Sequence, residues 1–499
     1  MLLEMKGITK AYGGVIANKQ VDFSLRKGEV HALVGENGAG KTTLMRILYG
    51  MESPTDGMIS LNGAPMFFSS PADAIANGIG MVHQHFMLYP SFTIAENIVI
   101  GREPRRFGFI DRMESESAVA GLSLQYGMPV DPRRVIADCP LGVQQRVEIL
   151  KVLHQGAEII ILDEPTGVLT PLEVKELLDS VRRLARSGKS FIIITHKLQE
   201  VMDVADRITV LRDGEVTGAV EASDTNVDEL SRMMVGRELI NLQRQQQAPG
   251  QPVLELGSIT LVGNGTKPVL DDVSLTVHAG EIVGIAGISG NGQSELLQVV
   301  SGLAQPDAGV LKLLGEDIAG ASVRKIRERG LAHIPEDRYQ WGVSKEATVA
   351  ENGLMGHTDK YQQYGVVRRG KVREMVRSWV ERFSIKTGSL DTKAQHLSGG
   401  NLQKLIVARE LEHRSPFLIA AEPTRGVDVG AMEVIHGELL KRRDEGGAIL
   451  LVSSELTEIL KLADRILVMY EGRIAGEVRA EDASEEQISL WMAGGKKDE

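Results

Sequence analysis

The sequence predicts an α/β fold that occurs twice within one chain of 499 residues. Short runs of continuous apolar residues, at 159–162 and 191–194, have strand length and the composition typical of a parallel sheet covered on both faces. A glycine-rich loop at 35–42 separates an apolar strand from a helical stretch that starts at residue 43. The pattern recurs at 287–294, and a repeat this long indicates duplicated domains rather than a solenoid of roughly 20–50-residue units.

The two copies align along most of the chain. Their glycine-rich loops are 252 positions apart, whereas Asp206 and Asp464, each before a matching strand, are 258 apart, so the second copy has six additional residues between these points. Each copy has the order strand, loop, helix, helical middle, apolar strand with an acid at its end, helix and strand. Gln, Pro and Gly residues at 243–252 favour an exposed, flexible linker. We therefore predict domains at 1–240 and 253–495, joined by a linker at 241–252.

The composition predicts a cytosolic protein that does not bind nucleic acid. The formal net charge is −11, whereas nucleic-acid binding depends on basic patches. Cys139 is the single cysteine, so no intrachain disulfide is possible and a reducing cytosol is expected. The first residues have no apolar signal core, and no run of about 18 apolar residues occurs that could span a bilayer.

Residues 35–42 match the phosphate-binding pattern GxxxxGK[ST] completely. Backbone amides of such a loop, with the helix N-terminus behind them, form a cradle for a nucleotide phosphate. Lys41 places a positive charge near the β- and γ-phosphates, and the Thr42 hydroxyl can ligate Mg²⁺. The alternative, a tight turn that packs a helix on a strand, leaves both side chains unexplained. The predicted nucleotide-binding residues here are Gly35, Glu36, Asn37, Gly38, Ala39, Gly40, Lys41, Thr42 and Thr43.

Polar residues at the ends of other predicted strands extend this chemistry. Asp163 and Glu164 follow the strand at 159–162, where the first can hold Mg²⁺ and the second can polarise the attacking water. The alternative is that these acids cap the next helix. His196 and Gln84 follow two further strands; the histidine could stabilise charge at the γ-phosphate, and the amide could touch Mg²⁺ and the water. For these two residues a structural role fits the sequence equally well.

Together these motifs resemble those of ATP-binding cassette (ABC) ATPases over nearly the whole chain. The resemblance implies two tandem P-loop domains, each with a RecA-like core, an antiparallel β subdomain and a helical subdomain, and it implies ATP and Mg²⁺ as ligands. It makes Gln84 the Q-loop residue, His196 the switch histidine and Tyr12 the aromatic that stacks on adenine. The implied catalytic residues are therefore Glu164, His196 and Gln84, with Thr42, Gln84 and Asp163 at the metal.

The resemblance also implies a signature motif at 397–401, which begins Leu-Ser-Gly-Gly. In the family this turn completes ATP binding across a head-to-tail dimer, here formed within one chain, so Ser398, Gly399 and Gly400 join the predicted nucleotide-binding residues. The matching position in the first copy has Pro140 instead of serine. The second copy has Gln293 for the lysine, Ala421 for the aspartate, Ser454 for the histidine and Glu336 for the glutamine, but it keeps Glu422.

These substitutions predict one hydrolytic site. The complete loop and acids of the first copy would be closed by the intact signature of the second, while the altered loop would face the altered signature. The second site could still bind nucleotide weakly. The alternative is that both copies hydrolyse ATP, but loss of a charge-stabilising group typically reduces the rate by about 10²–10³.

Within the family, the tandem copies and the motif at 334–338 resemble the fused ATPases of bacterial monosaccharide importers, and residues 83–86 and 144–151 look more like the nucleoside-uptake branch. We therefore expect nucleoside import, with monosaccharide import as the alternative. The resemblance implies two integral-membrane permease subunits, an indirect solute-binding protein and a position at the cytoplasmic face of the cell membrane. Remote alternatives are a soluble ribosome-associated tandem ATPase and a regulator that does not hydrolyse ATP.

Overall fold

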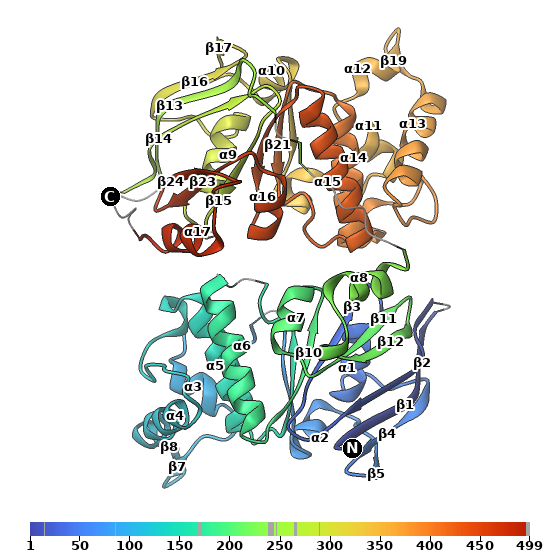
Figure 1. Cartoon of the computed structure of the whole chain (residues 1–499), viewed down its shortest axis with the longest axis vertical. Helices are drawn as coiled ribbons and strands as arrows, with labels where there is room; N and C mark the ends of the chain where they lie inside the picture. Colours follow the sequence, from blue (N-terminus) through green and yellow to red (C-terminus); the bar gives the residue numbers. More distant parts are fainter. Residues whose placement is uncertain are drawn as a thin grey trace. The chain divides into compact units, whose positions relative to one another are not determined.

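The computed structural model describes residues 1–13, 15–84, 86–167, 169, 171–237, 244–245, 247–263, 267–288 and 290–495. The chain forms two compact units, Met1–Leu239 and Ile240–Glu499. In each unit helices pack around a central sheet (Figure 1), which confirms the predicted α/β class in both copies. No helix within these described ranges is long and apolar enough to cross a membrane.

The central sheet of the first unit contains the apolar runs seen in the sequence. Its strand order is β12-β11-β3-β10-β9-β6, and every neighbouring pair is parallel except β11 with β12. β3, β9 and β10 are buried along their whole length, as expected for strands covered on both faces. The bounds are β3 (Val30–Gly35), β6 (Ile79–Val82), β9 (Ile159–Asp163), β10 (Ser190–Thr195), β11 (Arg207–Arg212) and β12 (Glu215–Glu221).

A second, antiparallel sheet of order β2-β1-β4-β5 and a helical region with α3, α4 and α5 flank this core (Figure 1), so the β and helical subdomains implied by the sequence are present. The strands are β1 (Leu3–Tyr12), β2 (Val15–Leu25), β4 (Asp56–Leu61) and β5 (Ala64–Met66). The helices are α1 (Lys41–Leu48), α2 (Pro71–Ala76), α3 (Ile94–Val99), α4 (Arg112–Tyr126), α5 (Leu141–His154), α6 (Pro171–Arg186), α7 (Leu198–Val204) and α8 (Val227–Val235), with 3₁₀ turns at Ile136–Asp138 and Ala222–Asp224.

The second unit repeats this plan. Its central sheet has the order β18-β21-β22-β15-β23-β24, and its antiparallel sheet has the order β14-β13-β16-β17. The strands are β13 (Pro252–Val262), β14 (Pro268–His278), β15 (Ile282–Ala286), β16 (Ala308–Leu313), β17 (Glu316–Asp317), β18 (Leu331–Ile334), β21 (Phe417–Ala421), β22 (Ala448–Val452), β23 (Arg465–Tyr470) and β24 (Arg473–Arg479). The helices are α9 (Gln293–Ser301), α10 (Val323–Glu328), α11 (Val349–Leu354), α12 (Thr358–Tyr361), α13 (Arg369–Arg382), α14 (Gly399–Glu412), α15 (Val429–Asp444), α16 (Leu456–Leu462) and α17 (Glu485–Met492), with a π-helix η3 (Arg338–Gly342) and a 3₁₀ turn η4 (Ala394–His396).

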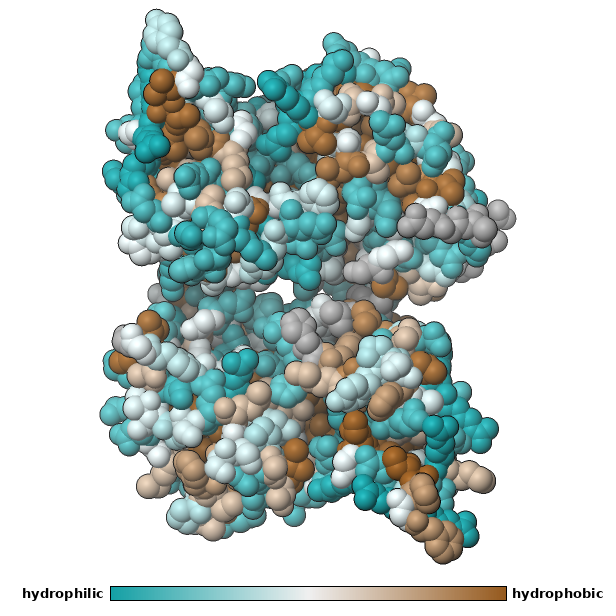
Figure 2. All heavy atoms as spheres, turned by 180° about the vertical axis from the view of Figure 1, so that it is seen from behind, coloured by the Kyte–Doolittle hydropathy of each residue, from teal (hydrophilic) through white to brown (hydrophobic). Residues whose placement is uncertain are grey.

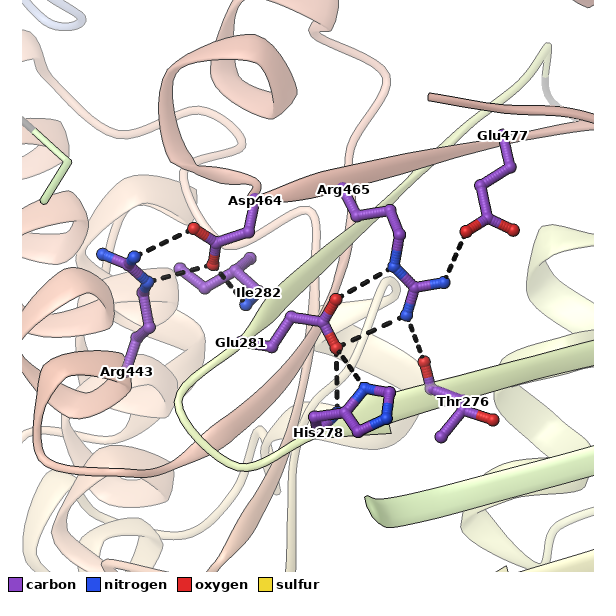
Figure 3. A network of polar contacts seen from close by, with 8 residues as sticks. All are labelled: Thr276, His278, Glu281, Ile282, Arg443, Asp464, Arg465 and Glu477. Carbon is purple, nitrogen blue, oxygen red and sulfur yellow. Dashed lines mark hydrogen bonds and ion pairs between the residues drawn. The ribbon is translucent and has the colours of Figure 1, made fainter. Parts of the chain in front are cut away.

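A polar network joins the first residues of β15 and β23 in the second unit's central sheet (Figure 3). Arg465 pairs with Glu281 at 2.9 Å, and the Asp464 carboxylate accepts a hydrogen bond from the Ile282 amide at 2.9 Å. The first unit has the same arrangement, since Arg207 pairs with Glu29 at 2.8 Å and Asp206 accepts from the Val30 amide. The shared strand-start motif therefore has a structural role in both units.

Arg443 is an addition specific to the second unit. Its fully buried guanidinium pairs with Asp464 at 2.9 Å (Figure 3) and donates to the Gln245 carbonyl, whereas the matching position of the first unit is Ala185. The Gly250 amide donates to the Ala279 carbonyl at 2.8 Å. The described part of the predicted linker is thus hydrogen-bonded to the second unit. Residues 241–243 and 246 lie outside the described residues, so the linker and domain limits stay predictions.

Each unit also has a projecting two-stranded hairpin before a long helix of the helical region. In the first unit β7 (Arg105–Arg106) and β8 (Phe109–Ile110) precede α4, and the tip residue Phe107 is 91% exposed. In the second, β19 (Gln362–Gln363) and β20 (Val366–Val367) precede α13, and Tyr364 is 96% exposed. Figure 2 shows apolar atoms at the corner formed by the first hairpin, at its lower right. No motif in the sequence predicted these hairpins.

Candidate functional site

The glycine-rich loop of the first unit is shaped by close contacts with β2. Gly40 has φ of 97°, and an added Cβ there would lie 2.3 Å from the Ala17 carbonyl oxygen. The Asn18 side chain donates to the Gly40 carbonyl at 3.1 Å. Gly38 has φ of 83° and faces open space. The loop therefore needs glycine at both positions, and its backbone is left open toward the place where a phosphate would bind.

Lys41 begins α1 and is only 6% exposed. Its Nζ donates to the carbonyls of Gly35 at 2.6 Å and Glu36 at 2.9 Å, which folds the side chain back along the loop. Burial lowers the pKa of the Lys41 ammonium, and the charges of Glu164 and Asp163 oppose that shift. A buried ammonium beside two carboxylates is a site prepared for an anionic ligand that carries a divalent cation.

Three neighbouring strands bring the predicted catalytic side chains together. β9 lies between β10 and β6, so Glu164, just after β9, has His196 on one side and Gln84 on the other. Gln84 Nε2 donates to Glu164 Oε2 at 2.9 Å, and His196 Nδ1 lies 3.3 Å from Glu164 Oε1. Glu164 adopts φ of 47° while its amide donates to the Ile194 carbonyl at 2.9 Å. A strained non-glycine backbone held in this way is typical of functional positions.

The two adjacent acids have opposite electrostatics. Burial, followed by the Glu164 charge, raises the pKa of Asp163 to about 6, against the effect of Lys41. The hydrogen bond with His196 lowers the pKa of Glu164 below its usual value, against burial. Glu164 is therefore ionised at neutral pH, whereas Asp163 is the carboxyl that a bound cation would stabilise in its charged form.

The residues around Asp163 fit a magnesium ion. Thr42 hydrogen-bonds to Asp163, and Gln84 uses its amide nitrogen on Glu164, so its oxygen is the ligand atom. A hydroxyl, a carboxylate and an amide oxygen are ligands that Mg²⁺ prefers, and it usually takes further ligands from phosphates and water. Among the described residues no group of three or more His, Cys, Asp or Glu side chains could hold a metal ion alone.

Tyr12 lies at the end of β1, beside the start of α1, and is 44% exposed. Its hydroxyl donates to Glu52, and burial followed by that hydrogen bond raises the pKa of Tyr12. The Lys10 ammonium lies 5.1 Å from the ring centroid. The ring is thus a stacking surface at the edge of the loop, although one cation already lies over it.

Comparison with known proteins identifies the family. The sequence pattern of the ABC transporter family matches residues 18–167 and 270–425, one stretch in each unit. This chain belongs to the ABC transporter family. Sequence relatives extend over the full length: it is 46% identical to the guanosine import ATP-binding protein NupO of Bacillus subtilis, across 100% of this chain and 98% of that protein.

Two further relatives also match over nearly their full length, and one of them is named for a sugar. The chain is 44% identical to the nucleoside import ATP-binding protein NupA of Lactococcus lactis subsp. cremoris, across 100% of this chain and 99% of that protein. It is 45% identical to the glucose import ATP-binding protein TsgD13 of Haloferax volcanii, across 99% of this chain and 96% of that protein. The resemblance to ABC ATPases is thus confirmed, and the chain is an ATP-binding ATPase of the import type.

The second unit of this ABC ATPase keeps the loop backbone but not its chemistry. Gly292 precedes α9 with φ of 105°, close to the 97° of Gly40. Gln293 is 8% exposed, and its Nε2 donates to the Ile288 carbonyl at 3.2 Å, the position that matches Glu36. Within the described ranges its Oε1 has no hydrogen-bond partner. The glutamine reproduces the fold-back of Lys41 without a positive charge.

The residues at the remaining catalytic positions of the second unit form hydrogen bonds with one another. Ser294 donates its hydroxyl hydrogen to Glu336 at 2.7 Å, so the residue that would ligate a metal is occupied by the Q-loop carboxylate. Ser454 donates to Glu422 from its amide at 2.6 Å and from its hydroxyl at 3.0 Å. Burial raises the pKa of Glu422 to about 7, against these hydrogen bonds. Ala421, buried at the end of β21, offers no ligand.

The two signature positions differ at their helix N-termini. Ser398 caps α14: its side chain accepts from the Asn401 amide and, at 2.8 Å, from the Asn401 side chain. Pro140 precedes α5 and provides no side-chain cap, while Gln144 donates to the Cys139 carbonyl at 2.9 Å. Ser398, Gly399 and Gly400 therefore form an ordered turn that presents a hydroxyl and backbone amides, which Pro140 cannot do.

The sequence reasoning missed one residue and one contact of these sites. Asn18 holds the Gly40 carbonyl from β2, and its 22-residue separation from that glycine gave no motif to recognise. The contact between Ser294 and Glu336 was also unforeseen, although the sequence showed Glu336 at the Q-loop position. His85, used to favour the nucleoside branch, lies outside the described residues.

Proposed function

We propose that this chain hydrolyses ATP at one site to power nucleoside uptake through two separate integral-membrane permease subunits. The observation that carries the proposal is the convergence of Gln84 and His196 on Glu164 beside Lys41. In the second unit Glu336 and Ser454 stand at the positions that match Gln84 and His196. Two relatives named for guanosine and nucleoside import support the solute class. A relative named for glucose import supports monosaccharide uptake as the second candidate.

The roles within the site follow from the geometry. Glycine-loop amides and Lys41 would bind the phosphates, and Tyr12 would stack on the base. Thr42, Asp163 and the Gln84 amide oxygen would hold Mg²⁺, which neutralises phosphate charge when bound. Glu164, kept ionised by His196, would accept a hydrogen bond from the attacking water, and His196 would donate to the γ-phosphate.

Closure of the site would come from the second unit. Ser398, Gly399 and Gly400 would contact the γ-phosphate of ATP bound at Lys41, so nucleotide favours a closed state and hydrolysis releases it. We propose domains at 1–240 and 253–495 with a linker at 241–252, at the cytoplasmic face of the membrane. A solute-binding protein would deliver the nucleoside to the permeases without touching this chain.

Reconstituted uptake tests the solute class. Proteoliposomes that contain the chain, its permeases and solute-binding protein should take up labelled guanosine in an ATP-dependent manner, with little competition by ribose or glucose. Uptake of glucose or ribose in preference to nucleosides would establish the second candidate instead.

Two measurements address the remote alternatives. Ribosomal RNA that copurifies with the native chain, in place of permeases, would support a ribosome-associated ATPase. Absence of Mg²⁺-dependent ATP hydrolysis by the assembled complex would support a regulator without turnover.

A further inference from the structure

Arg338 connects three segments of the second unit. It follows the Q-loop position Glu336 by two residues and begins the π-helix η3. Its Nη1 donates to the Gly399 carbonyl at 3.1 Å, in the signature turn, and to the Arg425 carbonyl at 3.0 Å, in the loop after β21. One guanidinium group therefore joins the Q-loop segment, the N-terminus of α14 and the loop that follows the retained Glu422.

The packing around this guanidinium depends on glycine. A Cβ on Gly399 would lie 2.9 Å from Arg338 Nη2, and a Cβ on Gly426 would lie 3.4 Å from Nη1. A Cβ on Gly400 would lie 2.6 Å from the Gly426 carbonyl oxygen. The signature glycines thus leave room for the arginine and for the neighbouring loop, besides any contact that they make with nucleotide.

The Arg338 guanidinium also adjoins an exposed aromatic surface. Tyr339 is 44% exposed and Trp341 is 53% exposed. Asp337 fixes the start of η3, because its carboxylate accepts from the amides of Tyr339 at 2.8 Å and Gln340 at 3.0 Å. The Arg338 guanidinium lies 5.6 Å from the Tyr339 ring centroid. A displacement of this aromatic surface would therefore be transmitted to Gly399 through the Arg338 side chain.

Among its described residues, the first unit has no such connection. Phe86 stands at the position that matches Arg338, 252 residues earlier, and it has no side-chain donor. The Cys139 carbonyl, at the altered signature, accepts a hydrogen bond from the side chain of Gln144 in α5. The arginine therefore occurs in the unit whose signature is complete, although that unit lacks the lysine, aspartate and histidine that would act beside a Q-loop.

We propose that Arg338 is a positioning residue for ATP hydrolysis: it holds the Ser398–Gly400 turn in the orientation that closes the site of the first unit and couples that turn to the exposed Tyr339–Trp341 surface. The proposal rests on the proposed function of the site. A guanidinium keeps its charge and supplies rigidly oriented donors, so a fixed distance to two carbonyls is maintained. Misplacement of a binding group by about 1 Å can reduce a rate by about 10²-fold.

The test compares Arg338→Met, Arg338→Lys and the control Arg324→Met in the full chain assembled with its permeases. Arg324 lies on the surface of α10 in the same unit, with its side chain 84% exposed, and pairs with Glu328 at 2.8 Å. We expect Arg338→Met to lower kcat for ATP at least about tenfold, with KM changed less than about threefold. Arg338→Lys should recover part of kcat, and Arg324→Met should match the wild type. Equal kcat in Arg338→Met and Arg324→Met would overturn the proposal.

A double-mutant cycle with Ser398→Ala separates positioning from general stability. If Arg338 acts through the signature turn, Arg338→Met should reduce kcat much less in the Ser398→Ala background than in the wild type. Full additivity of the two losses would overturn the proposal, as would a parallel loss of kcat and of fluorescent ATP-analogue binding at the first unit. Lys41→Ala reports on the proposed function alone: if it remains active, the assigned site is wrong; if it is inactive while Arg338→Met is active, only the role of Arg338 is wrong.

Discussion

The nucleotide loops and strand ends of the two units share a backbone and differ in chemistry. Glu164 and Glu422 have φ of 47° and 46°, and both donate their amides to the adjacent strand, at Ile194 and Val452. Their surroundings differ, since His196 lowers the pKa of Glu164 while burial raises that of Glu422 to about 7. The comparison shows that the strained scaffold persists without the complete set of catalytic side chains.

The retained backbone of the second unit has a use of its own. The loop after β21 contacts the signature turn through Gly426, and Arg338 joins both. If this unit supplies the signature, as we propose, it needs this framework although Gln293, Ala421 and Ser454 stand in its own site. The difference between the units is therefore one of site chemistry, and under the proposed function both units are required for turnover.

The largest expected effect separates the two glutamates. Glu164→Gln should reduce ATP turnover by about 10²–10⁴, because a general base is lost, whereas Glu422→Gln should change it less than about threefold. Steady-state hydrolysis by the permease complex measures both. Similar losses in the two variants would mean that both sites turn over.

Substitutions at Lys41 and Gln293, the matching positions of the two phosphate loops, test the same difference between the units. Lys41→Ala should lower turnover by about 10²–10³ through loss of charge at the phosphates, and Gln293→Ala should have little effect. The same hydrolysis assay applies, with thermal unfolding as the control for folding. Comparable losses in both variants would contradict a single hydrolytic site.

Rebuilding the second site should give a smaller change. The triple variant Gln293→Lys, Ala421→Asp and Ser454→His restores side chains that bind phosphate and metal, yet Pro140 still replaces the signature serine. We expect turnover within about twofold of the wild type until Pro140→Ser is added. A large gain from the triple variant alone would show that the signature at 140 is not limiting.

An effect that leaves turnover aside is on stability, and it has opposite sign in the two units. The raised pKa of Glu422 means that the folded chain binds more protons between pH 4.5 and about 7, so its contribution to the free energy of unfolding falls across that window, by about 3 kcal/mol. The lowered pKa of Glu164 gives a contribution that is present above pH 4.5 and lost as the pH falls through the folded pKa. Urea unfolding of Glu422→Gln and Glu164→Gln against pH should show these opposite trends relative to the wild type; parallel trends would contradict them.

The sequence predicted the parts that local patterns determine. The apolar run before Asp163 and the complete phosphate loop each lie within a short segment, so the strand, the loop and the helix could be recognised, and the fold class and family are confirmed. The convergence of Gln84 and His196 on Glu164 depends on β9 lying between β10 and β6, which no local pattern reveals. The contacts of Arg338 and Arg443 span 61 and 198 residues and follow no periodicity, so only the folded chain shows them.

The most direct test of the central claim is the amount of nucleotide trapped in the transition state. Vanadate mimics the γ-phosphoryl group in the transition state of its transfer. With Mg²⁺, ATP and vanadate, the permease complex should retain one ADP per copy of this chain. Trapping should disappear in Lys41→Ala and in Ser398→Ala but persist in Gln293→Ala. Two trapped ADP per chain, or undiminished trapping in Ser398→Ala, would contradict a single hydrolytic site shared between the two units.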